Sequence, residues 1–241
     1  MGSLAKCLPV TLRFEGGWAN DPHDPGGCTM KGVTLATFRH YRPRATAADL
    51  RNISDADLQT IYSNGYFSPI SGGALPSGVD LAAFDYAVNS GVEAARKALA
   101  ASTGLTSVSR VKAICARRLS ILHGLKTWAY FGKGWNARVT QVLALGIKWA
   151  SASPADATRE LQTAAAEHTR KAATKARAAV APATAAAGSV ASLHPAVQSP
   201  VPTIAVIALI VASLAAVGGL VFLIYRHQQT AAALTAASKE A

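Results

Sequence analysis

Three carboxylic acids and a threonine lie close together near the N-terminus, in a stretch rich in glycine and proline: Glu15, Asp21, Asp24 and Thr29. Hydrolysis of a glycosidic bond uses one protonated carboxyl group as a proton donor. A second carboxylate manages water or the positive charge that develops on the sugar. The residue types therefore fit glycosidic-bond chemistry. A lone glutamate before two glycines is also typical of a solvated helix end, so the neighbouring residues must distinguish the two interpretations.

The element expected to position Glu15 is a short helix over residues 4–14, whose apolar residues recur at helical spacing. Gly16 and Gly17 predict its end, because glycine adopts the left-handed conformation that closes many helices. Glu15 then lies at the negative end of the helix dipole, between Phe14 and Trp18. Both the dipole and apolar packing favour the protonated form of its carboxyl group, as a general acid requires.

The stretch 20–27 contains two prolines and two glycines. It is expected to form an irregular turn, because proline fixes φ and removes a backbone donor. Such a turn would hold Asp21, Asp24 and the Thr29 hydroxyl near Trp18, an aromatic ring that could stack on a sugar. This combination favours a hydrolytic site over a solvated helix end.

The run 15–34 begins Glu-Gly-Gly-Trp and continues Asn-Asp-Pro-His-Asp-Pro-Gly-Gly-Cys-Thr. It resembles the opening motif of glycoside hydrolase family 108, a family of phage and bacterial N-acetylmuramidases. Further similar motifs, in the family's order, lie at 61–67, 75–80, 84–91 and 131–139. The resemblance implies a lysozyme-like helical catalytic domain that acts on bacterial peptidoglycan, with Glu15 as the catalytic acid.

A more distant similarity to phage-type lysozymes implies the rest of the catalytic set. In those enzymes eight residues separate the glutamate from an aspartate, and a threonine follows nearby. Glu15 and Asp24 have this spacing, so Asp24 is favoured over Asp21 as the second carboxylate. Thr29 would help to position water or to stabilise the developing charge, and Asp21 is then a candidate substrate contact.

Further substrate contacts are expected from aromatic and polar side chains in these motifs: Trp18, Asp21, Tyr66, Phe67, Asp85 and Asn89. Phe67 stands where the family usually has tryptophan, which retains an aromatic surface. Asp85 and Asn89 lie one helical turn apart and could bind sugar hydroxyls. An equally good interpretation makes them a satisfied polar pair between two helices.

The fold is expected to be mainly α, because helical spacing recurs while strand-like alternation is nearly absent, with room for one small hairpin. Helices are predicted over 80–91, 110–125 and 139–149. The catalytic domain is placed at 1–95. A peptidoglycan-binding-like helical part follows at 96–150, shorter than is usual in the family, and this shortening puts its affinity for glycan in doubt.

Composition argues against several other kinds of site. The three cysteines, Cys7, Cys28 and Cys115, form no metal-ligand spacing, and buried free thiols are favoured over a disulfide. The histidines are scattered, so neither a metal nor a cofactor is expected. The formal net charge is +11, but no basic helix interleaved with stacking aromatics suggests nucleic-acid binding. A solvated basic face is the simplest account, and attraction to an anionic wall or membrane is the alternative.

The C-terminal part predicts a membrane anchor. An Ala-rich basic helix and an Ala/Ser/Pro linker are expected over 151–202. The segment 203–225 is apolar and long enough to cross a hydrocarbon core of about 30 Å as one transmembrane helix. A short polar tail follows at 226–241. Arg226 places this tail in the cytoplasm by the positive-inside tendency, and the hydrolase then faces the periplasm from the inner membrane of a bacterial host.

Against this orientation, the N-terminus does not resemble a signal peptide. A cytoplasmic domain that waits for membrane damage is therefore the alternative. Taken together, the sequence predicts a membrane-anchored peptidoglycan hydrolase used in phage lysis. The rival interpretation is a non-catalytic, membrane-tethered wall-binding or adaptor protein. The sequence does not indicate the oligomeric state.

Overall fold

The computed structural model describes residues 1–20 and 27–191, with side chains up to residue 174. Contacts divide the chain into one compact unit from Met1 to Ala157 and a second that begins at Thr158. Asp21, Asp24 and the predicted transmembrane segment 203–225 lie outside the described residues.

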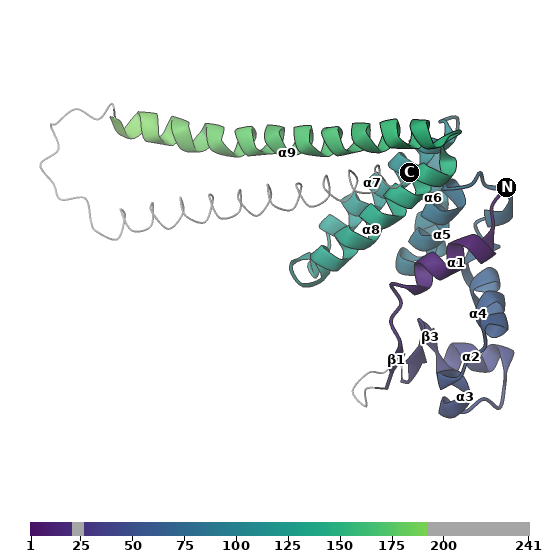
Figure 1. Ribbon diagram of the computed structural model, residues 1–241. Coiled ribbons are helices and arrows are strands. Elements are labelled where there is room, and N and C mark those ends of the chain that lie inside the picture. The colour runs from purple at the N-terminus through teal and green to yellow at the C-terminus, as the bar shows by residue number, and fades with distance from the viewer. Residues whose placement is uncertain (21–26, 192–241) are drawn as a thin grey trace, which may run out of the picture. The chain divides into compact units, whose positions relative to one another are not determined.

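The first unit is built mainly from helices, as the sequence predicts (Figure 1). Its α-helices are α1 (Leu4–Leu12), α2 (Leu35–Tyr41), α3 (Ala47–Arg51), α4 (Asp55–Tyr62), α5 (Val79–Ser90), α6 (Val92–Ala101), α7 (Ser107–His123) and α8 (Trp128–Ala150). A π-helical turn, Ser63–Phe67, continues α4, and a 3₁₀ turn, Gly72–Ala74, precedes α5. The predicted helices near residues 4–14, 80–91, 110–125 and 139–149 all form.

A small antiparallel sheet accompanies the first helices. Its strands are β1 (Trp18–Ala19), β2 (Thr29–Met30) and β3 (Val33–Thr34), in the order β1-β2-β3. Lys31 and Gly32 join β2 to β3, and both have positive φ, 48° and 76°. Positive φ at both central residues is what a tight two-residue hairpin requires. The sequence left room for one hairpin, and the structure adds β1 as a third strand.

Local side-chain caps fix where the short helices α2, α3 and α4 begin. The hydroxyls of Thr34, Thr46 and Ser54 accept hydrogen bonds from backbone N–H groups in the first turn of these helices. Asp49 completes a capping box by accepting a hydrogen bond from the backbone N–H of Thr46. Each cap satisfies a donor that has no partner inside its helix. The caps leave these helices little freedom in where they start.

Helix α5 is the centre of the first unit. Every residue from Val79 to Ala87 is buried, which is expected of a helix surrounded by packing partners. It contacts α1, α6, α7 and α8. At its start, a Cβ atom on Gly78 would collide with the Gly146 carbonyl oxygen of α8. Because glycine lacks this atom, the backbones of α5 and α8 can approach closely at this point.

Helix α9 (Pro154–Ala191) supplies the described part of the second unit. It begins three residues after the predicted start at 151, with the Ser153 hydroxyl accepting the Asp156 N–H and with proline at the first helical position. It continues to Ala191, so the prediction that an irregular linker begins at residue 181 is wrong for 181–191. In the part of the chain that the structure describes, no helix is both long and apolar enough to cross a membrane.

The three cysteines are buried free thiols, which agrees with the sequence-based interpretation. Burial is the main cause that raises the pKa of the Cys115 thiol to about 12. Burial, followed by the charge of Asp80, raises that of Cys7 well above its usual range. The unreactive, protonated forms of both thiols therefore dominate near neutral pH.

We expect native protein to react with a thiol reagent such as DTNB far more slowly than a free cysteine at about pH 8. Cys28 should react first, because it retains more solvent exposure than Cys7 or Cys115. Guanidinium-unfolded protein is the control and should release three equivalents, one for each cysteine. Rapid reaction of Cys7 or Cys115 in the native state would contradict the packing described here.

Candidate functional site

Glu15 lies just beyond the end of α1, where the chain leaves the helix. Its backbone N–H donates to the Leu12 carbonyl, and Gly16 turns the chain with a φ of 73°. The Glu15 side chain is 18% exposed. The carboxylate therefore stands at the edge of the core and stays accessible to solvent.

The guanidinium of Arg138, from the middle of α8, binds this carboxylate. Its Nη2 donates to Glu15 Oε1 at 2.7 Å and to Asp85 Oδ1 at 2.9 Å. Its Nε donates to Asp85 Oδ2 at 3.0 Å. The Phe14 ring lies 5.1 Å from the centre of the guanidinium. A single cation thus connects the end of α1 to the central helix α5.

A second arginine binds the same aspartate from α7. Arg118 Nη1 donates to Asp85 Oδ2 at 2.6 Å, and its Nη2 donates to Asn89 Oδ1 at 2.9 Å. Asp85 and Arg118 are almost completely buried. The result is a continuous chain of hydrogen bonds that runs from Glu15 through Arg138, Asp85 and Arg118 to Asn89.

Charge pairing determines the protonation of this cluster. Burial alone would raise the pKa of Asp85, but the guanidiniums of Arg118 and Arg138 outweigh it and hold that pKa below its ordinary value. Burial likewise opposes the charge on Arg138, but Asp85 and then Glu15 outweigh it and raise the pKa of that guanidinium. The Asp85 carboxylate and the Arg138 guanidinium therefore carry full charge at neutral pH.

The opposite side of Glu15 is formed by the β2–β3 turn and by α4. A Cβ atom added to Gly32 would lie 2.9 Å from Glu15 Oε2 and 2.6 Å from the Tyr62 hydroxyl oxygen. That hydroxyl donates to the Lys31 carbonyl at 2.7 Å. Burial first, and then the negative charge of Glu15, raise the pKa of Tyr62 and of its neighbour Tyr66. Glu15 is therefore enclosed by turn backbone and tyrosines as well as by Arg138.

The environment of Glu15 is thus only partly the apolar one that the sequence predicts. Phe14 is close by, as predicted, but Arg138 supplies a charged hydrogen-bond partner that the sequence did not indicate. This partner comes from α8, far along the chain from the residues that flank Glu15.

Trp18, Tyr66 and Thr29 are partly exposed, so a glycan could reach them. The Trp18 ring, on β1, lies 5.7 Å from the guanidinium of Arg51. The Thr29 hydroxyl, on β2, lies 3.4 Å from the Gly27 carbonyl oxygen. Asp21 and Asp24, the other acids of this stretch, lie outside the described residues.

The other predicted contact residues, Phe67, Asp85 and Asn89, make contacts inside the protein. Phe67 is buried and packs edge-on against Phe84, with ring centroids 5.7 Å apart. Asp85 has no exposed surface and is bound by two arginines, while Asn89 accepts from Arg118. Phe67 and Asp85 thus have little or no surface that a sugar could touch. For Asp85 and Asn89, this geometry matches the alternative of a satisfied polar pair between helices.

Arg118, Arg138, Gly32 and Tyr62 were not singled out from the sequence. The sequence does contain a sign of the two arginines. Arg118 lies four residues from Ile114 and from Leu122, and Arg138 lies four residues before Val142. Each arginine therefore falls on the apolar face of its helix, where a charge needs a buried partner. Nothing local to Gly32 or Tyr62 points to Glu15.

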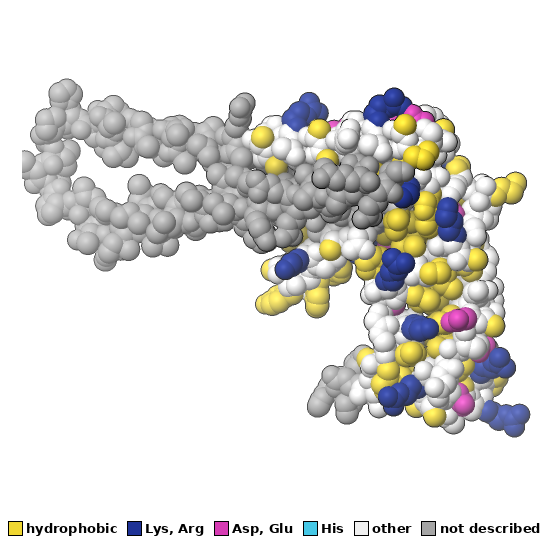
Figure 2. Space-filling view, viewed as in Figure 1, with side chains coloured by type: hydrophobic (Ala, Val, Ile, Leu, Met, Phe, Trp, Pro, Cys, Tyr) yellow, Lys and Arg dark blue, Asp and Glu magenta, His cyan; other side chains and the backbone are white. Residues whose placement is uncertain are grey.

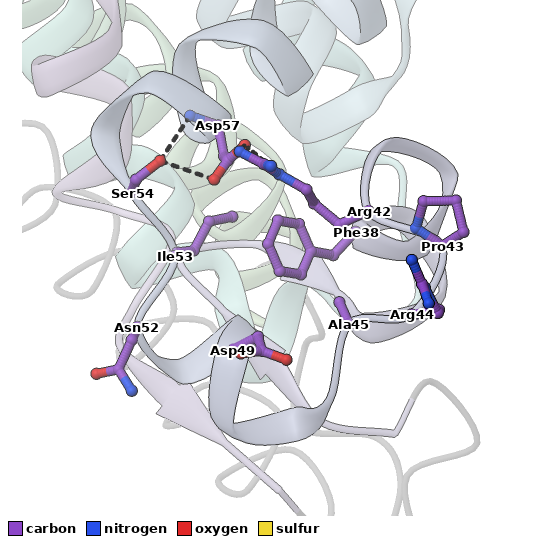
Figure 3. A pocket seen from close by; sticks show the side chains of 10 residues that line it. All are labelled: Phe38, Arg42, Pro43, Arg44, Ala45, Asp49, Asn52, Ile53, Ser54 and Asp57. Carbon is purple, nitrogen blue, oxygen red and sulfur yellow. Dashed lines mark hydrogen bonds and ion pairs between the residues drawn. The ribbon is translucent and has the colours of Figure 1, made fainter.

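A hollow of about 490 Å³ lies among α2, α3 and α4, away from these residues (Figure 3). Phe38, Ala45 and Ile53 supply its apolar lining, and the Arg42–Asp57 ion pair lies at its edge. None of the residues around Glu15 lines it. Within the described ranges, no group of three or more His, Cys, Asp or Glu side chains could hold a metal ion.

Comparison with known proteins gives two similarities. The sequence model of the family described as Glycosyl hydrolase 108 matches residues 8–91. Among solved structures, Brucella abortus SagA is 32% identical to the chain, with a TM-score of 0.54. This similarity covers 62% of the chain and 96% of SagA. No match was found among proteins of curated function. The family match includes Glu15, Tyr62 and Asp85, whereas Arg118 and Arg138 follow it.

Replacing Asp85 by asparagine should leave Arg118 and Arg138 buried without their shared anion. We expect Asp85→Asn to lower the free energy of unfolding by about 3–5 kcal/mol, measured by urea denaturation. Glu93→Gln is a matched control, because it removes an exposed carboxylate paired with Lys97. Its effect should stay within about 0.5 kcal/mol. Equal effects of the two substitutions would contradict the central role of Asp85.

The same cluster predicts acid sensitivity. The pKa of Asp85 lies below its ordinary value of 3.8 in the folded state, so in acid the unfolded chain binds the proton more readily. The stability that Asp85 contributes is fully present above about pH 4 and is lost as the pH falls through its folded-state pKa. Asp85→Asn should therefore flatten the acid limb of a plot of stability against pH.

Proposed function

The chain belongs to the Glycosyl hydrolase 108 family and is a glycoside hydrolase, and we propose that it is an N-acetylmuramidase. The bond cleaved joins N-acetylmuramic acid to N-acetylglucosamine in bacterial peptidoglycan. Glu15 is the general acid that protonates the glycosidic oxygen. The observation that carries this assignment is the position of Glu15, partly exposed and fixed by Arg138 at the edge of the core.

Arg138 would assist the proton transfer electrostatically. When Glu15 gives its proton to the leaving oxygen, negative charge develops on its carboxylate. A guanidinium already in place stabilises that charge without reorganisation. Arg138 donates only to Oε1 of Glu15, which leaves Oε2, on the side of Gly32, to carry the transferred proton. Asp85 keeps Arg138 paired while Glu15 changes its protonation.

Asp24 is our candidate for the second carboxylate, with Thr29 as its helper. Its support is the phage-lysozyme-like spacing from Glu15 and its place in a turn-forming stretch. Asp24 would position the attacking water or stabilise the oxocarbenium-like sugar. Carboxyl groups about 5 Å apart would give retention, and a separation of roughly 6.5–9.5 Å would give inversion.

The cellular role that fits this chemistry is lysis of a bacterial host by a phage. The apolar segment 203–225 supports an anchor in the inner membrane, and Arg226 supports a catalytic domain that faces the periplasm. There the domain would meet its peptidoglycan substrate. Trp18, Asp21 and Tyr66 are our candidates for contacts with the glycan.

The direct test is hydrolysis of purified peptidoglycan by the full chain and by Glu15→Gln. The variant should fold normally and lose activity by about 100-fold or more, because it cannot donate the proton. New reducing ends on N-acetylmuramic acid identify the bond. Glu93→Gln, which changes an exposed carboxylate, should keep full activity. Activity of Glu15→Gln equal to that of the wild type would remove Glu15 from the mechanism.

The second carboxylate can be assigned in the same assay. Asp24→Asn should be more severe than Asp21→Asn, and the reverse order would reassign the role. New amino groups without new reducing ends would indicate an amidase or endopeptidase. No release of any product by the wild type would favour the rival interpretation, a tethered wall-binding or adaptor protein.

Gly32 offers a test of the geometry around Glu15. In Gly32→Ala the added Cβ would collide with Glu15 Oε2 and the Tyr62 hydroxyl, at a φ of 76° that alanine rarely adopts. We expect activity to fall about tenfold or more through displacement of the carboxylate. Gly17→Ala is the matched control, because a Cβ there has no atom within 4 Å. Equal activity of the two variants would contradict the described site.

A further inference from the structure

The connection between α7 and α8 carries a concentration of exposed hydrophobic side chains. Ile121, Leu125, Tyr130 and Phe131 lie within this short stretch, and Tyr130 and Phe131 are 83% and 57% exposed. Figure 2 shows hydrophobic side chains gathered at this end of α8. We call these four residues the hairpin tip. Most large apolar residues of the first unit are buried, so the tip requires an explanation.

Stacked aromatic rings support the tip from within. The His123 and Trp128 rings stack with centroids 4.0 Å apart, and Trp135 lies 6.1 Å from Trp128 and 5.6 Å from Phe131. A Cβ on Gly132 would collide with the Trp128 ring, so glycine allows this ring to lie flat on α8. The exposed side chains therefore project from an ordered base.

The charge around the tip has one sign. Between Glu93 and Asp156 the chain contains ten lysines and arginines and no aspartate or glutamate. Arg118 and Arg138 are buried in the site described above. Lys126 and Lys133 are exposed, and each follows a residue of the tip closely in the sequence. An apolar protrusion flanked by lysines is complementary to a surface that is negatively charged outside and apolar beneath.

We propose that the hairpin tip docks on the surface of a bilayer that contains anionic lipids. Tyr130, Phe131 and Leu125 enter the interfacial layer, where aromatic side chains are favoured. Lys126 and Lys133 meet the lipid phosphates. A small glycan fragment fits this surface less well, because ligand pockets are concave and bury most of the ligand, whereas the Tyr130 side chain is 83% exposed. The proposal does not depend on the chemistry of Glu15 or on the segment 203–225.

The test needs a probe that reports on the tip alone. Tyr130→Cys in the full chain can be labelled with an NBD fluorophore, since the native cysteines are buried. Wild-type protein treated in parallel measures background labelling. The labelled protein is then mixed with vesicles that contain phosphatidylcholine with a nitroxide spin label on its acyl chain, with or without phosphatidylglycerol. The nitroxide quenches NBD only at close range, so the signal reports contact of residue 130 with acyl chains, however the rest of the chain is attached.

We expect about twofold or stronger quenching with vesicles that contain phosphatidylglycerol and little with phosphatidylcholine alone. The control is Asn64→Cys, labelled in the same way, because residue 64 is exposed and lies far along the chain from the tip. It should show little quenching with either kind of vesicle. Adding Lys126→Glu and Lys133→Glu to the Tyr130→Cys protein should abolish most of the quenching. Circular dichroism and thermal melting establish that each variant is folded.

Three outcomes would overturn the proposal. The first is equal quenching at positions 64 and 130, and the second is quenching that does not depend on phosphatidylglycerol. The third is an NBD response to soluble peptidoglycan fragments but not to vesicles, which would make the tip a wall-binding surface. Wall hydrolysis in solution is measured separately with Glu15→Gln, so a failure of the catalytic proposal and a failure of this one remain distinguishable.

Discussion

The guanidinium of Arg138 is the interaction on which the candidate site depends. This guanidinium is buried, and its hydrogen-bond donors are shared between Asp85 in the core and Glu15 at the edge of the core. A buried cation without an anionic partner costs several kcal/mol, on the order of 3–5 when one partner is removed. Arg138 must therefore stay close to Asp85, and Glu15 is held by Nη2, which also donates to Asp85. The position of Glu15, the proposed general acid, is set by the need of a buried charge to be paired.

Helix α5 makes this arrangement possible. It is packed on all sides by other helices of the first unit, so Asp85 can receive arginines from α7 and from α8 at once. An apolar cluster of similar volume would fill the same space, often without loss of stability. Such a cluster would provide no directional hydrogen bond from α8 to Glu15. The charged core thus provides geometry that apolar packing lacks, and it connects the family-matched stretch 8–91 to the helices that follow it.

The other walls of the site come from short-range structure. Positive φ at Lys31 and Gly32 closes the β2–β3 turn, and the Tyr62 hydroxyl fixes that turn by binding the Lys31 carbonyl. Because Gly32 has no side chain, Glu15 Oε2 can lie against the turn. Glu15 is therefore held between the hairpin and a guanidinium, and such preorganisation is what the proposed proton transfer to a bound sugar requires. The hairpin tip of α7 and α8 shows the opposite design, with apolar side chains directed to the outside.

The sequence by itself determined the features that depend on neighbouring residues. Helical spacing predicted α1, α5, α7 and α8, the Gly16–Gly17 pair predicted a turn soon after α1, and the scattered cysteines predicted buried thiols. The type and spacing of Glu15 and its neighbours, with the family resemblance, predicted a glycoside hydrolase. Only the tertiary structure decided what surrounds Glu15 and which polar residues are inside. Arg138 lies 123 residues from Glu15, and their contact exists because α5 brings α1 and α8 together. Asp85 is a residue of a type that often binds sugar hydroxyls, but helix packing buries it between two arginines. This burial follows from the three-dimensional arrangement of the helices, which no local sequence pattern contains.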